Sequence, residues 1–452
     1  MEFLDTVTLS RLITAMTLIF HIIFATLGVG VPLFISIAEF IGIKKKDKHY
    51  ELLAKRWARG FVITVAIGVV TGTAIGLQLS LVWPNFMELA GNVIALPLFM
   101  EVFAFFFEAI FLGIYLYTWD RFKGKYTHWF LSIPVVIGAG MSAVFITTVN
   151  SFMNSPAGFT MVNGEFAAVN PLEAMFNPSS PTRILHVLGG SYVTVAAILA
   201  TIAAIALLRK KGAAAYHKKA LKMTVISIFV FSIFTAVAGD VSAKYLAKHQ
   251  PEKLAAAEWH FETEENADLI LFGWLNEENE PVGEIRLPGF LSFLAHGDFS
   301  SEVTGLNETP EDERPPLIIH YFFDLMVSIG LFLLGISFLY LVLSRFKRFN
   351  VHNRLMLWML AASGPLAMLA VEFGWVFAEL GRQPWILRGY MTVEEAATSS
   401  PYILHMFFLF LALYIVLGTL CVRTLRKLFK DNPVEVELEK HYPELSKGDE
   451  SA

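Results

Sequence analysis

The chain is poor in charge and has almost no cysteine. Charged residues make up 17% of its 452 residues, hydrophobic residues make up 55%, and the mean hydropathy is +0.56. A soluble domain of this length carries far more charge, so the composition indicates an integral membrane protein. Cys421 is the only cysteine. That excludes an internal disulfide, a cysteine-ligated iron–sulfur cluster and covalent haem attachment through C-x-x-C-H.

Nine apolar stretches are long enough to cross a membrane as helices, which takes about 20 residues each. The leader MEFLDTVTLS has acidic residues in place of the basic start of a signal peptide. We therefore expect the first stretch to remain as a helix. The predicted spans are residues 10–43, 60–83, 93–118, 128–149, 183–208, 220–245, 317–343, 355–378 and 402–426.

Positive charge alternates between the connections and predicts the orientation. Segments 44–59, 119–127, 209–222 and 345–354 together hold twenty Lys and Arg, whereas 84–92 and 150–182 hold none. By the positive-inside rule, the N-terminus lies outside, and the basic loops and the C-terminal tail lie in the cytoplasm. The net charge of −5 comes largely from one outside loop and gives no sign of nucleic acid binding.

The predicted fold is an all-α polytopic membrane protein with one large extracytoplasmic loop. Residues 1–245 hold spans one to six, 246–316 form the loop, 317–430 hold spans seven to nine, and 431–452 form a tail. A loop this long is unusual and is typically functional or disordered. Because it contains the apolar patches LILFGWL and LPGFLSFLAH, we expect it to fold against the membrane surface.

Two outside segments have distinctive sequences. QPEKLAAAEWHFET, at the start of the long loop, reads as a short helix with Pro251 in its first turn and Lys253 and Glu258 near its ends. A solvated amphipathic helix is the alternative. In GWVFAELGRQPW, residues 374–385, Trp375 and Glu379 share a helix face, and Gly381 can act as the helix stop.

Ionisable and sulfur-bearing side chains within the spans lie mostly in the outer half of the membrane. Such residues are costly at bilayer depth and usually mark a pathway or a ligand site. Glu101 and Glu108 share one face of span three, about 12 Å and about 22 Å below its outer end at 1.5 Å per residue. Two stacked carboxylates favour a proton path, since each can hold and pass a proton.

The strings GRQPW and QPEKLAAAE closely resemble subunit I of the cytochrome bd family of terminal quinol oxidases. LSRLITAMTLIFH before His21, AFFFEAIFLGIYLYTWDR in span three, and nine spans with an outside loop after the sixth also fit. The resemblance covers nearly the whole chain apart from the tail. It implies a low-spin haem b, a high-spin haem b and a haem d, quinol oxidation near the long loop, and reduction of dioxygen to water.

The resemblance also implies the haem ligands. His186 and Met326 match the axial pair of the low-spin haem, an arrangement that raises the haem potential. His21 and Glu379 match the ligands of the two high-spin haems, and the sequence leaves open which of them holds haem d. Some relatives have a basic residue two positions before the methionine, where this chain has Asp324.

Further residues receive roles from the same resemblance. Glu101, Glu108 and Asp120, with Ser142 as a possible relay, would form a proton path from the cytoplasm. Lys253 and Glu258 would bind quinol, with the carboxylate accepting a quinol proton. Three more would border the haems: Arg11 and Arg382 at propionates and Trp375 between macrocycles. Six other histidines are given no role in the site: His320 and His405 are read as interfacial, and His49, His128, His217 and His352 as parts of cytoplasmic loops.

Because the quinol segment and the haem ligands share the outer half, electrons should travel laterally while protons rise from the cytoplasm. That separates charge without pumping. The family implies a second membrane subunit and often a small single-span subunit, in the cell membrane. Two other functions remain open: a di-haem b electron-transfer subunit, which favours two His pairs, and a proton-coupled transporter. The sequence does not distinguish menaquinol from ubiquinol.

Overall fold

The computed structural model describes residues 5–210 and 212–443. Within that part of the chain, nine helices are long and apolar enough to cross a membrane, which confirms the predicted spans. They are α1 (Thr6–Lys45), α2 (Lys48–Val82), α3 (Pro84–Tyr117), α4 with α5 (Lys125–Phe130 and Ser132–Asn154), α7 (Ser180–Leu208), α8 (Ala214–His249), α11 (Ile319–Leu343), α12 (Arg354–Leu380) and α14 (Ile403–Asp431).

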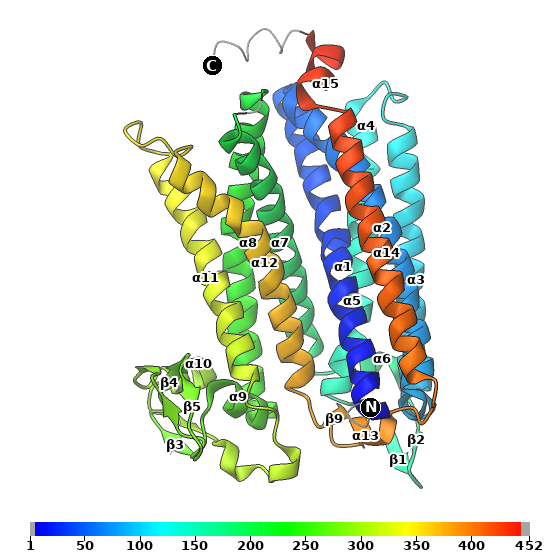
Figure 1. Ribbon diagram of the computed structural model, residues 1–452, viewed down its shortest axis with the longest axis vertical. Coiled ribbons are helices and arrows are strands. Elements are labelled where there is room, and N and C mark those ends of the chain that lie inside the picture. The colour runs from blue at the N-terminus through cyan, green and yellow to red at the C-terminus, as the bar shows by residue number, and fades with distance from the viewer. Residues whose placement is uncertain (1–4, 211, 444–452) are drawn as a thin grey trace.

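The long helices form two groups that stand side by side (Figure 1). In one group α7 packs on α8 and α12, and α11 packs on the same two helices. In the other group α1 packs on α2, α5 and α14, and α3 packs on α5. Contacts of α1 and α5 with α7 join the groups. We call them the α7–α12 bundle and the α1–α5 bundle.

Polar residues set the ends of the helices. The Asp5 carboxylate accepts the backbone N–H of Thr8 at the start of α1, and Asn353 caps α12 by accepting from Met356. Lys46, with a φ of 54°, ends α1, and Asp47 then caps α2 at His49. α2 therefore begins twelve residues before the predicted span at residue 60, because its first turns are polar and carry no hydropathy signal.

The long connection after α8 is a folded segment that packs on the ends of α8, α11 and α12. The buried residues Leu246, Leu254, Leu269 and Leu291 cluster there. It contains α9 (Pro251–Glu258), α10 (Phe290–His296), the 3-10 turns η1 (Leu306–Glu308) and η2 (Glu311–Glu313), and the antiparallel pairs β3 (Glu264–Glu265) with β8 (Glu302–Val303), β4 (Leu269–Leu271) with β7 (Ile285–Leu287), and β5 (Trp274–Leu275) with β6 (Pro281–Val282).

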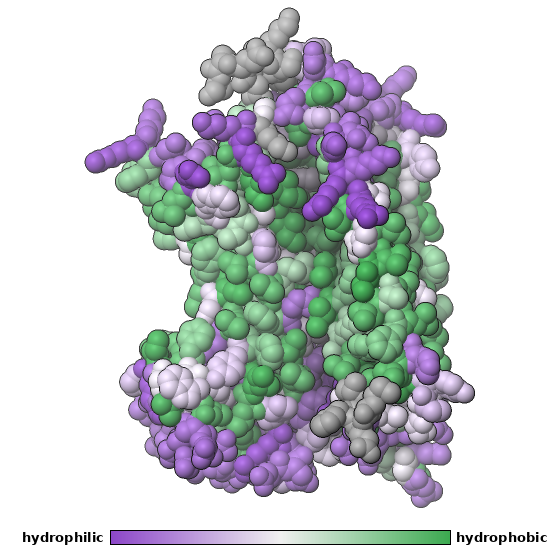
Figure 2. Space-filling model, in the orientation of Figure 1, coloured by the Kyte–Doolittle hydropathy of each residue, from purple (hydrophilic) through white to green (hydrophobic). Residues whose placement is uncertain are grey.

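Both ends of the molecule are hydrophilic, and an apolar band separates them (Figure 2). At one end lie α9, the strands above and the start of α1; we call this the loop end. The opposite basic end carries the connections 46–47, 118–124, 209–213 and 344–353. Smaller elements at the loop end are β1 (Thr160–Val162), β2 (Glu165–Ala167), α6 (Pro171–Met175), β9 (Trp385–Leu387), β10 (Met391–Thr392) and α13 (Val393–Ala396).

The C-terminal segment docks at the basic end. Glu437 in α15 (Val434–His441) pairs with Arg56 and Arg59 of α2. The predicted tail, 431–452, therefore contains a docked helix, α15, and residues 444–452 lie outside the described part of the chain. His128, expected in a cytoplasmic loop, lies in α4 and is 4% exposed, so that expectation was wrong. It was also wrong for His49 and His217, which are buried in α2 and α8.

Candidate functional site

His186 lies in the α7–α12 bundle with one ring nitrogen fixed by α8. Its Nδ1 lies 3.2 Å from the backbone carbonyl of Thr235. Because a carbonyl only accepts hydrogen bonds, Nδ1 carries the proton and Nε2 keeps its lone pair. Gly239 leaves room beside the ring, since a Cβ there would lie 3.3 Å from His186 Cε1. The side chain is therefore oriented so that it can bind a metal through Nε2.

His21 in the α1–α5 bundle is held in the same way. The Thr71 hydroxyl donates to the Ile67 carbonyl at 3.0 Å, so it accepts from His21 Nδ1 at 2.8 Å. Nε2 again keeps its lone pair. Gly72 borders the ring, because a Cβ there would lie 3.3 Å from His21 Cε1.

Met326 on α11 faces a glycine on the neighbouring helix. A Cβ on Gly374 of α12 would lie 2.9 Å from Met326 Sδ, closer than real contacts of this kind. The thioether therefore points into space that only a glycine leaves open. Among the described residues no three His, Cys, Asp or Glu side chains gather as a bare metal site. The candidate ligands lie singly instead.

Glu379 stands at the end of α12, between the bundles. Its Oε1 accepts from Asn150 Nδ2 of α5 at 2.5 Å, and its Oε2 accepts from Arg382 Nη2 at 2.6 Å. Asn150 Oδ1 in turn accepts from Arg183 Nη1 at 3.2 Å. Trp375, one turn before Glu379, is half-buried. Figure 2 shows hydrophilic residues in the groove between the bundles toward the loop end.

Several buried polar atoms in this region have no partner within the described chain. Arg382 leaves Nε and Nη1 without hydrogen bonds, and Glu372, two turns before Glu379, leaves both carboxyl oxygens without any. Arg11, expected to face a haem propionate, is exposed, and its Nη2 donates to Gln383 Oε1 at 3.1 Å. Arg11 thus contacts the GRQPW turn from outside.

The predicted helix in QPEKLAAAEWHFET is α9, and it is buried. Lys253 and Glu258 are each 2% exposed, so the solvated reading was wrong. Lys253 Nζ donates to the Ala378 carbonyl at 2.9 Å and lies 4.8 Å from the Phe377 ring. Burial, with Arg183 and Arg382 nearby, lowers the pKa of Lys253 well below its usual value.

Glu258 faces α11. Its Oε2 is buried without a partner, and burial together with the Asp324 carboxylate raises the pKa of Glu258 well above its usual value. Asp324 accepts the Phe272 N–H at 2.7 Å. His320, expected at the interface, is fully buried; its Nδ1 lies 2.7 Å from the Ala257 carbonyl and its Nε2 lies 3.4 Å from Asp324.

Gly381 follows α12, but with a φ of −70° it does not adopt the left-handed conformation of a glycine helix stop. Glycine is required for another reason. A Cβ at Gly381 would lie 2.6 Å from Lys253 Cε and 2.6 Å from the Phe377 carbonyl. The turn therefore lets α9 approach the end of α12.

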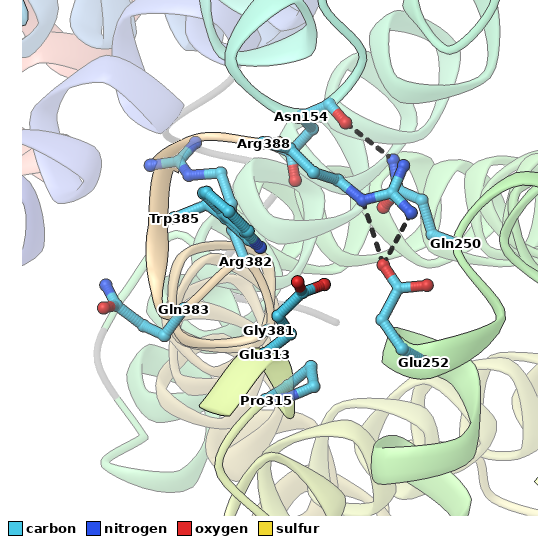
Figure 3. A pocket seen from close by; sticks show the side chains of 10 residues that line it. All are labelled: Asn154, Gln250, Glu252, Glu313, Pro315, Gly381, Arg382, Gln383, Trp385 and Arg388. Carbon is cyan, nitrogen blue, oxygen red and sulfur yellow. Dashed lines mark hydrogen bonds and ion pairs between the residues drawn. The ribbon is translucent and has the colours of Figure 1, made fainter. Parts of the chain in front are cut away.

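A pocket opens where this turn meets the start of α9 (Figure 3). Arg388 and Glu252 form an ion pair at 2.7 Å on one wall, and Gln250 Nε2 donates to the Asn154 carbonyl at 3.0 Å. The pocket is lined by Asn154, Gln250, Glu252, Glu313, Pro315, Gly381, Arg382, Gln383, Trp385 and Arg388.

The predicted proton path lies along α3. The Ser142 hydroxyl of α5 donates to Glu101 Oε1 at 3.0 Å. Glu108 is 4% exposed and its Oε1 has no partner. Asp120 at the basic end has a side chain that is 84% exposed and lies 3.5 Å from Lys55 Nζ.

Sequence reasoning missed Asn150, Arg183, Glu372, His320 and Asp324 as neighbours of these groups. Asn150 begins the segment 150–182, which holds no Lys or Arg, and Arg183 follows it, but only the fold shows that Asn150 donates to Glu379 and Arg183 donates to Asn150. Glu372 could have been recognised from the sequence, because it is an acidic residue seven positions before Glu379 on the same apolar helix.

Residues 9–433 match the family model described as cytochrome bd terminal oxidase subunit I. A solved structure of bd oxidase from Geobacillus thermodenitrificans is 57% identical, with a TM-score of 0.91, over 96% of this chain and 100% of that one. A Bacillus subtilis (strain 168) protein, provisionally named cytochrome bd menaquinol oxidase subunit I, is 40% identical over 96% of this chain and 99% of its own. A cytochrome bd ubiquinol oxidase subunit 1 of the same organism is 32% identical over 92% and 91%. The chain belongs to the cytochrome bd terminal oxidase subunit I family.

Proposed function

We propose that this chain oxidises quinol at its loop end and reduces dioxygen to water at haems held between its helices, with protons taken from the opposite face. Family membership makes it a multi-pass membrane subunit of a terminal quinol oxidase, with haem cofactors and a second membrane subunit as partner. The finer proposal rests on one observation. His186 and His21 each have Nδ1 fixed by a hydrogen bond, which leaves the Nε2 lone pair available as a ligand.

The residues present fit haem. Three candidate ligands, His21, His186 and Met326, each face a glycine on the neighbouring helix, where any Cβ would crowd them. Single ligands suit haem because the macrocycle supplies the other four nitrogens. Arg382, with two buried nitrogens that have no partner, suits a propionate.

We assign His186 and Met326 to a low-spin haem b, and His21 and Glu379 to a high-spin haem b and a haem d. Bound haem supplies reversible one-electron chemistry at iron and, where one axial position is open, binding of dioxygen. Asn150 and Arg382 hold the Glu379 carboxylate from both sides and so fix it between the bundles. Trp375, one turn away, and Arg11, on the outside of the turn, would bound the same space.

Quinol would bind at α9 and the GRQPW turn. The pocket there borders Gly381 and Arg382 and the start of α9, and Lys253 lies against the same turn. Glu258 accepts a quinol proton only when it is ionised, and its raised pKa makes that state less populated at neutral pH. His320 and Asp324 lie beyond it.

Protons for water formation would enter at Asp120 and pass Glu108, Ser142 and Glu101 toward the loop end. Asp120 is the exposed group of this series, and Glu101 is already hydrogen-bonded to Ser142. With the basic end in the cytoplasm, uptake there and release of quinol protons at the loop end separate charge without a pump. A small single-span subunit would complete the complex.

The optical spectrum of the purified complex tests the proposal. We expect a reduced-minus-oxidised spectrum with b-type bands and a chlorin band far to the red, and extraction into alkaline pyridine should yield both haem types. Haem b alone would indicate the electron-transfer subunit, and absence of haem would indicate a transporter. Either result contradicts the proposed oxidase chemistry.

A further inference from the structure

A buried cluster of titratable side chains lies at the basic end, where α1, α3 and α4 meet. Glu39 on α1, Tyr115 on α3 and His128 on α4 are 4%, 1% and 4% exposed. His128 Nδ1 lies 2.6 Å from Glu39 Oε1, and the Tyr115 hydroxyl donates to Glu39 Oε2 at 2.7 Å. The Tyr115 ring stacks on His128 with centroids 4.5 Å apart. None of these residues has a role in the function described above.

The hydrogen bonds fix where protons reside. His128 Nε2 lies 2.9 Å from the Tyr115 carbonyl, which only accepts, so Nε2 carries a proton. The short contact between Nδ1 and Glu39 Oε1 then needs one further proton between the two atoms. The pair therefore stores a proton that either partner can hold: imidazolium with carboxylate, or imidazole with carboxylic acid.

The cluster lies between the exposed and buried ends of the proposed path. Asp120 lies five residues before α4 and its side chain is 84% exposed, so it stands at the solvent side. Tyr115, Leu112 and Glu108 lie on the buried stripe of α3, and the step from Tyr115 to Glu108 spans about 10 Å at 1.5 Å per residue. The Tyr115 hydroxyl donates to Glu39, and Glu108 Oε1 has no partner in the described chain, so no hydrogen bond joins the two side chains directly.

A small cavity borders this step and has room for roughly one water molecule. It is lined by Pro32, Ile35, Leu112, Tyr115, Ser132 and Val135. Leu112 is one turn from Glu108, and Glu108 packs on Gly138, one turn from Val135. Water in this cavity would join the Tyr115 hydroxyl to the region of Glu108.

We propose that Glu39, His128 and Tyr115 form a gated proton relay that loads Glu108 from Asp120. The inference rests on the proposed uptake path and adds its missing segment. Glu39, once protonated by His128, passes a proton to Tyr115 as the Tyr115 hydroxyl releases its own to water in the cavity. The discharged pair leaves the Nδ1 lone pair facing a carboxylate, which draws the next proton from the Asp120 side. One proton enters for each that leaves, and no redox step occurs.

The test compares quinol-dependent oxygen consumption per haem in the intact complex for Glu39→Gln, His128→Asn, Tyr115→Phe and Glu108→Gln. Ser36→Ala is the matched control. Ser36 is buried at the same corner and is hydrogen-bonded to Trp129 and Ser132, but it does not titrate. We expect Glu39→Gln and His128→Asn to slow turnover at least about tenfold, as loss of a proton-transfer group does. Haem spectra should be unchanged and the solvent deuterium isotope effect larger, with Ser36→Ala near the wild-type rate.

The outcomes separate this relay from the path it serves. Slow Glu108→Gln with full activity in the Glu39 and His128 variants would overturn the relay and leave the path intact. Slow relay variants with a fully active Glu108→Gln would overturn the proposal as stated, because the three residues would then serve a path that does not pass through Glu108. If the single variants do not assemble, the double variant Glu39→Gln/His128→Asn keeps a neutral hydrogen-bonded pair and decides in the same way. A wild-type rate and isotope effect in Tyr115→Phe would remove its hydroxyl from the relay.

Discussion

The Glu379 carboxylate on α12 accepts a hydrogen bond from Asn150 on α5, with 2.5 Å between Oε1 and Nδ2. These residues are 229 positions apart and belong to different bundles. Glu379 is therefore positioned by both halves of the membrane domain, and a ligand bound by its carboxylate would respond to any change in how the bundles pack. Outer groups of this kind orient metal ligands and tune them.

We expect Asn150→Ala to perturb the haem that Glu379 holds while leaving the His186–Met326 haem unchanged. The loss of such an outer partner typically costs about 10- to 100-fold in affinity or activity. Optical spectra and haem content per complex measure the effect, with Asn170→Ala in an exposed connection as the control. An unchanged high-spin spectrum together with full activity would show that Asn150 does not position the carboxylate.

Gly374→Ala should disturb Met326. The new Cβ would lie 2.9 Å from Sδ, so either the helix or the thioether must move. We expect the low-spin haem to lose its six-coordinate spectrum and its potential to fall, because thioether ligation raises it. Gly330→Ala on α11 is a suitable control, since a Cβ there meets nothing within 4 Å. A normal spectrum in Gly374→Ala would argue against Met326 as a ligand.

Gly381→Ala should weaken quinol oxidation through Lys253. The added Cβ would lie 2.6 Å from Lys253 Cε, and displacement of a substrate-positioning group by about 1 Å can cost up to about 100-fold. We expect the quinol KM to rise about tenfold, as in Lys253→Met, with haem spectra unchanged. Gly113→Ala, where nothing lies within 4 Å, controls for an added methyl. A wild-type KM in Gly381→Ala would place Lys253 outside the quinol site.

The pH dependence of quinol oxidation should report Glu258. Its pKa is raised, first by burial and then by Asp324, so its proton-accepting carboxylate becomes populated only as pH rises. We therefore expect kcat/KM for quinol to increase with pH over a range above that in which an ordinary glutamate ionises. Asp324→Asn removes the like charge, lowers the pKa of Glu258 and moves the rising limb to lower pH.

Lys253 also has a shifted pKa, so Lys253→Met serves as the comparison. If its profile keeps the rising limb, that limb belongs to Glu258. The low-spin haem spectrum checks that Asp324→Asn leaves nearby Met326 in place. A profile that does not move in Asp324→Asn would contradict the assignment of the limb to Glu258.

The sequence was sufficient for the membrane helices, because each span carries its own hydropathy signal over about 20 residues. It was weaker at their ends. α2 begins at Lys48 and α4 at Lys125, in charged segments that look like loops. His128 was assigned to a cytoplasmic loop for that reason. Its burial depends on Glu39, 89 residues away, and no local pattern predicts such a pairing.

The candidate site also divides into residues that a local pattern predicts and residues that only the fold brings together. His21 and His186 were apparent because histidine is costly within a span. The groups that fix their tautomers, Thr71 and Thr235, lie on neighbouring helices and are ordinary residues in sequence. Gly381 was recognised, but for a conformation it does not adopt, because the approach of Lys253 is a tertiary contact.

Glu108→Gln should slow oxygen reduction while leaving the low-spin haem spectrum intact. Glu108 packs against Gly138, where α3 and α5 meet, and its buried Oε1 has no hydrogen-bond partner in the described chain. Glutamine keeps the shape of the side chain but cannot pass a proton, so the defect should appear as slower turnover, about 100-fold for a group that transfers protons, with normal haem content. Oxygen uptake per haem measures it, and Glu88→Gln, at the loop-end start of α3, controls for the loss of a carboxylate. A Glu108→Gln variant with full activity would mean that protons reach Glu101 by another route.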